Sequence, residues 1–235
     1  MNYRISVLTS IYKSSEFLFD FLLDAKRQSI FNQIEFLLLD ANEDDADYKI
    51  IEPFLFHKNF KYKKIGKCNV YEAWNIGIEL SSAPILTNWN TDDRRSYNSL
   101  DTQTSYLEQN TDVDMCYGNL KISNNPNEIF EHCNSNKYWP CYEGTLENQL
   151  KHNSPHCLPA WRKDVHEKFG KFNTNYFCAA DYDMWFRILQ GGGKLKYIRD
   201  IVGVYYENPI SISRNPTNLT KAIKEVEKIR KVYSL

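Results

Sequence analysis

Apolar and polar residues alternate in blocks through the first 98 residues, in the order expected for strands that alternate with helices. The expected strands are Tyr3–Ser10, Ile34–Leu39, Phe60–Lys63 and Pro84–Trp89. Ile34–Leu39 is almost entirely apolar, which is typical of a strand buried on both faces of a parallel sheet. Repeated strand–helix units predict a right-handed, mostly parallel sheet flanked by helices.

Helical spacing fills the gaps between these strands. Phe17, Leu18 and Phe21 recur on one face of a helix expected over Glu16–Gln28, with Ser14 or Ser15 as its N-cap. A short helix follows the acidic loop 42–47 and stops near Pro53. A third helix is expected from an Asn69 cap through Leu80.

The second half of the chain is less regular. The expected strands are Met115–Leu120, Glu128–His132 around an Asn-rich turn, and Leu195–Tyr206 with a break near Asp200. The expected helices are Arg162–Phe169 ended by Gly170, Asp181–Gln190 ended by Gly191, and Asn218–Tyr233 with Leu219, Ile223, Val226 and Ile229 on one face.

Length and charge narrow the class of protein. The 235 residues carry 29 Lys and Arg against 30 Asp and Glu, a net charge of −1, and 42% are hydrophobic. The near balance argues against a nucleic-acid partner, which needs a basic stripe. The apolar content excludes a disordered chain, and no 20–50-residue repeat recurs. We expect a single α/β domain.

The first residues run directly into a strand pattern, so we expect no secretory signal, and no apolar run approaches the ~20 residues needed to span a bilayer. The six scattered cysteines contain no C-x-x-C pair, which favours reduced thiols and a cytoplasmic location. His152, His156 and Cys157 lack a fourth ligand at useful spacing, so a structural zinc is disfavoured.

Polar side chains stand where the expected parallel strands end. Thr9 and Asp40 close two of these strands, and Asp92 and Asp93 follow the fourth. Ligands of such sheets bind at the carboxyl ends of the strands, which suggests a nucleotide-type pocket. Adjacent carboxylates can hold a divalent cation on a diphosphate; the alternative is a helix N-cap with a solvated first turn.

Asp181 begins a predicted helix, where the positive amino terminus favours an ionised carboxylate. Such a group could take a proton from a sugar hydroxyl; the alternative is again an N-cap. Lys67 precedes a helix and could contact phosphate, although a solvated lysine is commoner. His156, beside two prolines, is more often a packing residue. No nucleophile elbow, Walker loop or G-x-G-x-x-G occurs.

Taken in order, the motifs resemble the family-2 glycosyltransferases of the GT-A fold over about residues 3–213. The matching segments are Ile5–Lys13, Gln28–Phe31, Glu35–Asp40, Ala73–Ile78, Trp89–Asp93, Pro159–Lys163, Phe169–Phe172 and Ala180–Arg187. The resemblance implies an inverting transfer of a sugar from a UDP- or dTDP-linked donor to a glycan or lipid-linked saccharide acceptor.

The same resemblance assigns roles to residues. Its implied nucleotide ligands are Thr9, Ile11, Asp40, Lys67, Asn75 and Asp92. Asp93, with Asp92, would coordinate Mn²⁺ or Mg²⁺, and Asp181 would be the catalytic base. The implied sugar or acceptor contacts are His156, Trp161, Arg162 and Trp185.

Three positions depart from the family pattern. Asn90 replaces the first acid of its D-x-D-type motif, and Ala180 replaces the acid before the base. A histidine of the last segment is replaced by Asn208 or its neighbour Glu207, so a third metal ligand is left open.

Residues 1–98 are expected to bind the donor, 99–213 the acceptor, and 214–235 to form a terminal helix. The lysines of this helix leave a membrane-surface contact open, but Glu225 and Glu227 dilute the charge and favour a solvated face. Two other functions stay open: an inactive nucleotide- or glycan-binding module, and a nucleotidyltransferase, which would want a glycine-rich loop that Ser10–Glu16 lacks.

Overall fold

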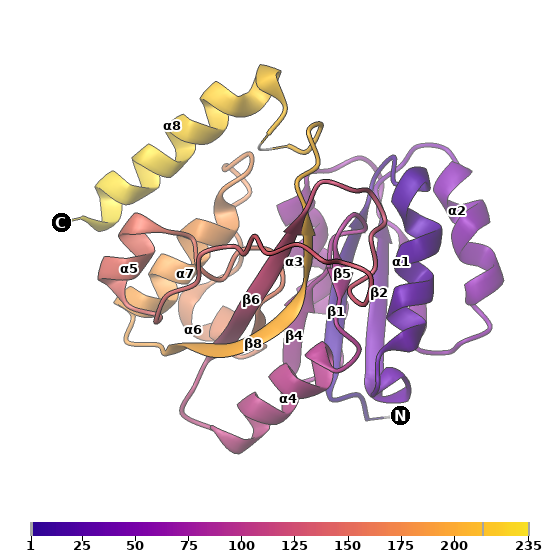
Figure 1. Ribbon diagram of the computed structural model, residues 1–235, viewed down its shortest axis with the longest axis horizontal. Coiled ribbons are helices and arrows are strands. Elements are labelled where there is room, and N and C mark those ends of the chain that lie inside the picture. The colour runs from indigo at the N-terminus through magenta and orange to yellow at the C-terminus, as the bar shows by residue number, and fades with distance from the viewer. Residues whose placement is uncertain (1, 213, 235) are drawn as a thin grey trace.

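The computed structural model describes residues 2–212 and 214–234; Met1, Ser213 and Leu235, where some of the expected boundaries fall, lie outside the described residues. Figure 1 shows one central sheet with helices on both faces. Within the described residues the sheet has eight strands in the order β3-β2-β1-β4-β7-β6-β8-β5. The predicted α/β class is confirmed.

The strands are β1 Ile5–Ile11, β2 Ile34–Asp40, β3 Phe60–Lys64, β4 Ile85–Asn88, β5 Arg94–Arg95, β6 Met115–Ser123, β7 Ala160–Arg162 and β8 Leu195–Tyr206. The pairs β1–β2, β1–β4, β2–β3 and β6–β8 are parallel, and β7 and β5 pair antiparallel with their neighbours. The chain builds outward from β1 to β3 and then returns to the other side of β1 as β4. The strand order therefore reverses between β1 and β4, the position at which such sheets bind ligands.

The α-helices are α1 Ser15–Arg27, α2 Ala46–Ile51, α3 Val70–Leu80, α4 Ser99–Gln109, α5 Leu146–Lys151, α6 Val165–Phe169, α7 Ala180–Gln190 and α8 Pro216–Tyr233. Two 3-10 turns, η1 Phe31–Gln33 and η2 Glu52–Phe54, complete the set. The predicted Asn69 cap is confirmed, and it forms a full capping box with Glu72.

The two faces of the sheet are covered by different helices. One core joins the sheet to α1, α2 and α4 through residues such as Phe21, Ile51 and Leu107. The other joins it to α3, α6 and α7 through residues such as Trp74 and Trp185. This two-sided burial explains why β2 is buried at every position.

Several sequence expectations are wrong in the second half. Glu128–His132 is not a strand, because the amides of His132 and Cys133 turn back onto the Ile129 carbonyl oxygen. The helix expected from Arg162 begins at Val165, since Arg162 closes β7 instead. The break expected near Asp200 is a bulge inside a continuous β8, where Arg199 has a φ of 38°.

Only part of the predicted apolar face of helix α8 is buried. Figure 1 shows it along the outside of α7, and Ile229 packs there against Tyr182 and Phe186. Leu219 and Ile223 of this face are 45% and 50% exposed, whereas Ile229 is buried. In the described residues no helix is long and apolar enough to cross a membrane, and all six cysteines are free.

Gly203 of β8 determines how closely β5 approaches. A Cβ atom at Gly203 would lie 2.3 Å from the Arg94 carbonyl oxygen and 2.6 Å from Leu158 Cδ1. We therefore expect Gly203→Ala to lower the free energy of unfolding by about 2–3 kcal/mol, because a backbone atom must move. Urea titration checks this, with Gly77→Ala as the comparison.

The closest contacts of a Cβ atom at Gly77 would be the side-chain ends of Leu39 and Leu8, both at 2.9 Å. Its cost is expected to be smaller, because side-chain ends yield more easily than backbone. Equal losses in the two variants would contradict the backbone explanation.

Candidate active site

A pair of carboxylates follows β4 at the reversal point of the sheet. Asp92 accepts a hydrogen bond from Asn208 Nδ2 at 3.1 Å. Asp93 accepts from the Tyr206 amide and from Asn90 Nδ2, both at 3.3 Å. The end of β8 and the residues after it therefore contact the pair, although they lie more than a hundred residues away in the chain.

Asp93 is almost completely buried, with 1% of its surface exposed. Burial, followed by the neighbouring Asp92 charge, raises the pKa of Asp93 to about 8. Burial also raises the pKa of Asp92, against the opposing hydrogen bond from Asn208. Two carboxyl groups that resist joint ionisation are the kind of donor set that a cation stabilises.

The donors at this pair are hard oxygens, which suit Mg²⁺ or Mn²⁺ better than a soft metal. In the described part of the chain, no cluster of three or more His, Cys, Asp or Glu side chains is placed to hold a metal ion. Asp92 and Asp93 thus fit a divalent cation whose other ligands come from a substrate or from water. Of the two candidates for a third ligand, Asn208 faces the pair, whereas Glu207 forms an ion pair with Arg214.

Two buried arginines hold the loop that carries the acids. Arg94 donates to the carbonyl oxygens of Thr91 and Asp93 at 2.8 and 2.7 Å. Arg95 donates to Gln103 Oε1 and Thr87 Oγ1 at 2.7 and 2.6 Å. Burial lowers the pKa of Arg95 to about 9. Their hydrogen bonds fix the turn between β4 and β5 from inside the fold.

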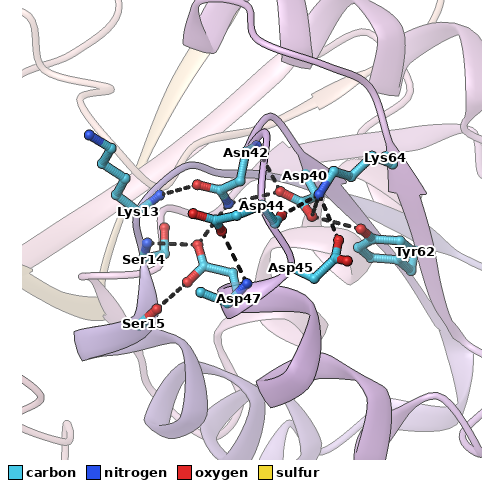
Figure 2. A network of polar contacts seen from close by, with 11 residues as sticks. Lys13, Ser14, Ser15, Asp40, Asn42, Asp44, Asp45, Asp47, Tyr62 and Lys64 are labelled. Carbon is cyan, nitrogen blue, oxygen red and sulfur yellow. Dashed lines mark hydrogen bonds and ion pairs between the residues drawn. The ribbon is translucent and has the colours of Figure 1, made fainter.

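Asp40 lies at the end of β2 in a polar network that Figure 2 shows. Its Oδ1 accepts from the Asn42 amide and side chain at 2.9 and 2.8 Å, and its Oδ2 accepts from the Tyr62 hydroxyl at 2.6 Å. Lys64 adds an ion pair at 3.5 Å. A nucleobase N–H would have to replace one of these donors to reach Asp40.

The same network fixes the start of α1. Asp47 accepts from the Ser14 amide at 2.8 Å and from the Ser15 hydroxyl, as Figure 2 shows. Ser14 occupies the N-cap position but makes no side-chain cap. The expected N-cap position of Ser14 is confirmed, but its hydroxyl does not cap the helix, because the carboxylate of Asp47, in the first turn of α2, satisfies this helix terminus instead.

The other expected nucleotide ligands lie in different settings. The Thr9 hydroxyl is buried without a hydrogen-bond partner, which leaves it able to bind a ligand. The Ile11 side chain is in the core, and Lys67 is exposed before α3. Asn75 uses both ends of its amide on the Phe172 backbone, at 2.9 and 3.0 Å. Contact of these residues with a nucleotide stays a prediction.

Asp181 lies at the amino terminus of α7. Its two carboxylate oxygens accept from the Tyr71 hydroxyl and from Asn153 Nδ2, each at 3.0 Å. Burial raises the pKa of Asp181, while the hydrogen bonds from Asn153 and Tyr71 oppose the shift. A general base works best when its pKa lies nearer the operating pH and the group is still able to ionise. Burial and the two hydrogen bonds act on Asp181 in these two directions.

His156 has a positive φ of 44° and stacks on Trp139 with ring centroids 3.8 Å apart. Tyr205 packs edge-on against it at 4.5 Å. Burial lowers the pKa of His156 to about 3, so the ring is neutral, and its Nδ1 has no partner. Strained backbone is often found at functional sites, and the unpaired nitrogen could bind a ligand. Contact of His156 with a substrate therefore stays a prediction.

Three of the expected sugar or acceptor contacts lie elsewhere. Trp161 and Trp185 are 0% and 1% exposed, so these rings are core and not sugar platforms. Arg162 pairs with Ile85 at the start of β4, at the opposite edge of the sheet from the acids. Its guanidinium holds the carbonyl oxygens of residues 107, 110 and 113. Membership of a matching segment therefore did not place these three side chains at the site.

One segment, residues 153–157, joins the two acidic centres; the sequence had indicated His156 as a substrate contact but neither Asn153 nor the link itself. Asn153 contacts Asp181, and four residues later the buried Cys157 side chain lies near enough to Asp93 for each group to shift the pKa of the other. The Cys157 carbonyl oxygen accepts from Asn88 Nδ2 at 2.8 Å, which ties the segment to the end of β4. No local pattern marks Asn153, and Cys157 was considered only as a zinc ligand, since the contacts of both residues with the acids are long-range.

The profile of glycosyl transferase family 2 matches residues 6–168, more than half of the chain. The chain belongs to glycosyl transferase family 2. The match runs from β1 through α6, so it includes the acid pair and ends before Asp181. A comparison with curated proteins gives no match.

Solved structures show the same fold as this family-2 chain. TarS 1-349 of S. aureus in complex with UDP-GlcNAc superposes with a TM-score of 0.76 at 13% identity, covering 96% of this chain and 66% of that one. The mannosyltransferase PcManGT of Pyrobaculum calidifontis, in complex with GDP-Man and Mn²⁺, gives 0.68 at 13% identity, covering 97% and 65%. The chain covers only 39% of the longer S. aureus TarS structure. The GT-A fold expected from the sequence is thereby confirmed.

Proposed function

We propose that this glycosyltransferase moves a sugar from a nucleotide-sugar donor to a saccharide hydroxyl with inversion, in one displacement. The observation that carries the proposal is the pair of acidic centres, Asp92–Asp93 and Asp181, joined by residues 153–157 at the carboxyl edge of the sheet. Nucleotide sugars and Mn²⁺ in the neighbouring structures support this choice of substrate and metal. We infer a UDP- or dTDP-linked donor and a glycan or lipid-linked saccharide acceptor.

In the proposed mechanism Asp181 accepts the proton of the acceptor hydroxyl. The acceptor oxygen forms a bond to the anomeric carbon while the bond from that carbon to the diphosphate breaks, and the nucleoside diphosphate leaves with the electron pair. Attack from the face opposite the leaving group inverts the anomeric centre. When bound at Asp93 and Asp92, Mn²⁺ or Mg²⁺ supplies positive charge that stabilises the diphosphate.

The donor half of the proposal is residues 1–98, with the Thr9 hydroxyl as the group best prepared for a nucleotide because it is buried and unpaired. Asp40 would accept a hydrogen bond from the nucleotide base only if the base replaced a present donor such as Tyr62 or Asn42. Residues 99–213 would receive the acceptor.

The test is release of nucleoside diphosphate from a panel of UDP-, dTDP- and GDP-sugars, with Mn²⁺, Mg²⁺ or EDTA. We expect release from at least one donor, faster with a saccharide acceptor and at least tenfold slower in EDTA. Donor binding without turnover on any acceptor would favour an inactive binding module. Formation of a nucleotide sugar from a sugar phosphate and a nucleoside triphosphate would favour a nucleotidyltransferase.

A further inference from the structure

Both oxygens of the Asp181 carboxylate are held, and the two donors come from separate parts of the fold. The Tyr71 hydroxyl on α3 donates to Oδ1, and Asn153 Nδ2 donates to Oδ2, each at 3.0 Å. The backbone amides of Asp181 and Tyr182, at the start of α7, also favour the ionised carboxylate. The carboxylate is therefore oriented by two side chains from distant parts of the chain and by the start of its own helix.

Tyr71 is itself fixed by its neighbours. Its amide donates to Asn69 Oδ1 in the cap of α3, and its ring packs against Trp74 and Phe172 with centroids 5.3 and 6.0 Å away. The nearby Ala180 amide opposes the rise in the Tyr71 pKa that burial causes. With its ring packed and its backbone in the cap, Tyr71 holds its hydroxyl at Asp181 Oδ1.

Asn153 is fixed in the same way. Its carbonyl oxygen accepts from Trp139 Nε1 at 3.0 Å, and its side-chain oxygen faces Gln149 Nε2 at 3.5 Å. This arrangement leaves Nδ2 for Asp181. Since Cys157 of the same segment contacts Asp93, a displacement of Asn153 would also change the spacing between the two acidic centres.

We propose that Tyr71 and Asn153 are positioning residues that aim Asp181 at the acceptor hydroxyl and keep it able to act as a base. The inference rests on the proposed function, since it assigns these residues through the base. Two fixed donors from different parts of the fold hold the carboxylate in one rotamer. A base that already points at the acceptor hydroxyl needs less reorganisation to take its proton.

The groups around Asp181 determine how its titration can be measured. Burial raises the pKa of Cys178, of Tyr182 and of Tyr71, so all three are neutral in the acid range. From α8, Glu225 accepts from the amides of Phe177 and Cys178, and Arg230 donates to the Tyr182 hydroxyl. His152 is next to Asn153 in the chain, so it requires its own control.

Tyr71→Phe removes one donor to the ionised carboxylate and keeps the ring. The pKa of Asp181 should then rise by about one unit, because a hydrogen bond to a charged group favours the charged form. A base with a higher pKa stays protonated to a higher pH. The acid limb of kcat/KM should therefore move upward by about one pH unit, and Asn153→Ala should move it in the same direction.

The pKa itself can be read without turnover, by ¹³C NMR of aspartate carboxyl groups, with the Asp181 signal assigned by its loss in Asp181→Asn. The matched control is Tyr117→Phe, which removes a buried hydroxyl that donates to the Tyr142 carbonyl oxygen. His152→Gln controls for the neighbouring imidazole. Neither control should move the Asp181 titration.

An unchanged Asp181 titration in Tyr71→Phe and Asn153→Ala would overturn the inference, whether or not the enzyme turns over a donor. A further check is Tyr71→Phe in an Asp181→Asn background. If Tyr71 acts through the base, the second substitution should change the remaining rate less than twofold. A full additional loss there would show a structural role instead. Absence of release from every donor, with the titration shifted as expected, would count against the proposed function alone.

Discussion

Asp181→Asn is expected to reduce the rate of sugar transfer by about 10²–10⁴-fold, the usual contribution of a general base. Asn keeps the shape of the side chain but cannot take a proton. The donor is predicted to bind at the other acidic centre, so its dissociation constant should change less than threefold. Steady-state transfer assays measure the rate, and calorimetric titration of the nucleotide-sugar donor in the absence of acceptor measures the dissociation constant.

The matched control for this variant is Asp164→Asn, which removes an exposed carboxylate that pairs with Lys168. It should leave transfer unchanged. Asp181→Asn should not lower the melting temperature at pH 7.5, because burial disfavours the charged form of Asp181. Transfer that survives in Asp181→Asn at the wild-type rate would show that another group is the base.

Asp93→Asn is expected to lower metal-dependent transfer by at least about 10²-fold and to weaken the response to Mn²⁺. The side chain is buried beside Asp92, so Asn fits the same space and removes a carboxylate without opening a cavity. Transfer rates over a Mn²⁺ titration give both the maximal rate and the concentration for half activation.

Two other variants complete that experiment. Asp112→Asn removes an exposed acid paired with Lys194 and should leave the Mn²⁺ curve unchanged. Asn90→Asp adds a carboxylate beside Asp93, which Asn90 already contacts, and should lower the Mn²⁺ concentration for half activation. A normal Mn²⁺ response in Asp93→Asn would refute the assignment of Asp93 as a metal ligand.

Local patterns in the sequence were sufficient for the elements that bury a continuous apolar stripe. β1, β2, α1 and α3 fall within a few residues of their predicted ranges. α4 was not predicted because its buried face mixes Leu100 and Leu107 with the polar Ser99, Gln103 and Thr104, so its apolar stripe is interrupted. β5 and β7 have two and three residues and exist only through pairing with β8, β4 and β6.

The candidate site divides in a similar way. The acids at a strand end or helix start, such as Asp40, Asp93 and Asp181, stand out because the position itself implies exposure to a ligand. No comparable position in a strand or helix distinguished the aromatic candidates. Trp161 and Trp185 belong to a core between the sheet and α7, and aromatic character alone does not separate a sugar platform from a packing residue.

By itself, the sequence determined the fold class, the order of the first strands and helices, and the acids that end them. Only the tertiary structure decided that Asn208 rather than Glu207 faces Asp92, that Tyr71 and Asn153 hold Asp181, and that Asp40 is already engaged. Periodicity and capping are properties of neighbouring residues. Burial and hydrogen bonding at the site instead join positions up to 116 residues apart, and these contacts shift the pKa values of the acids.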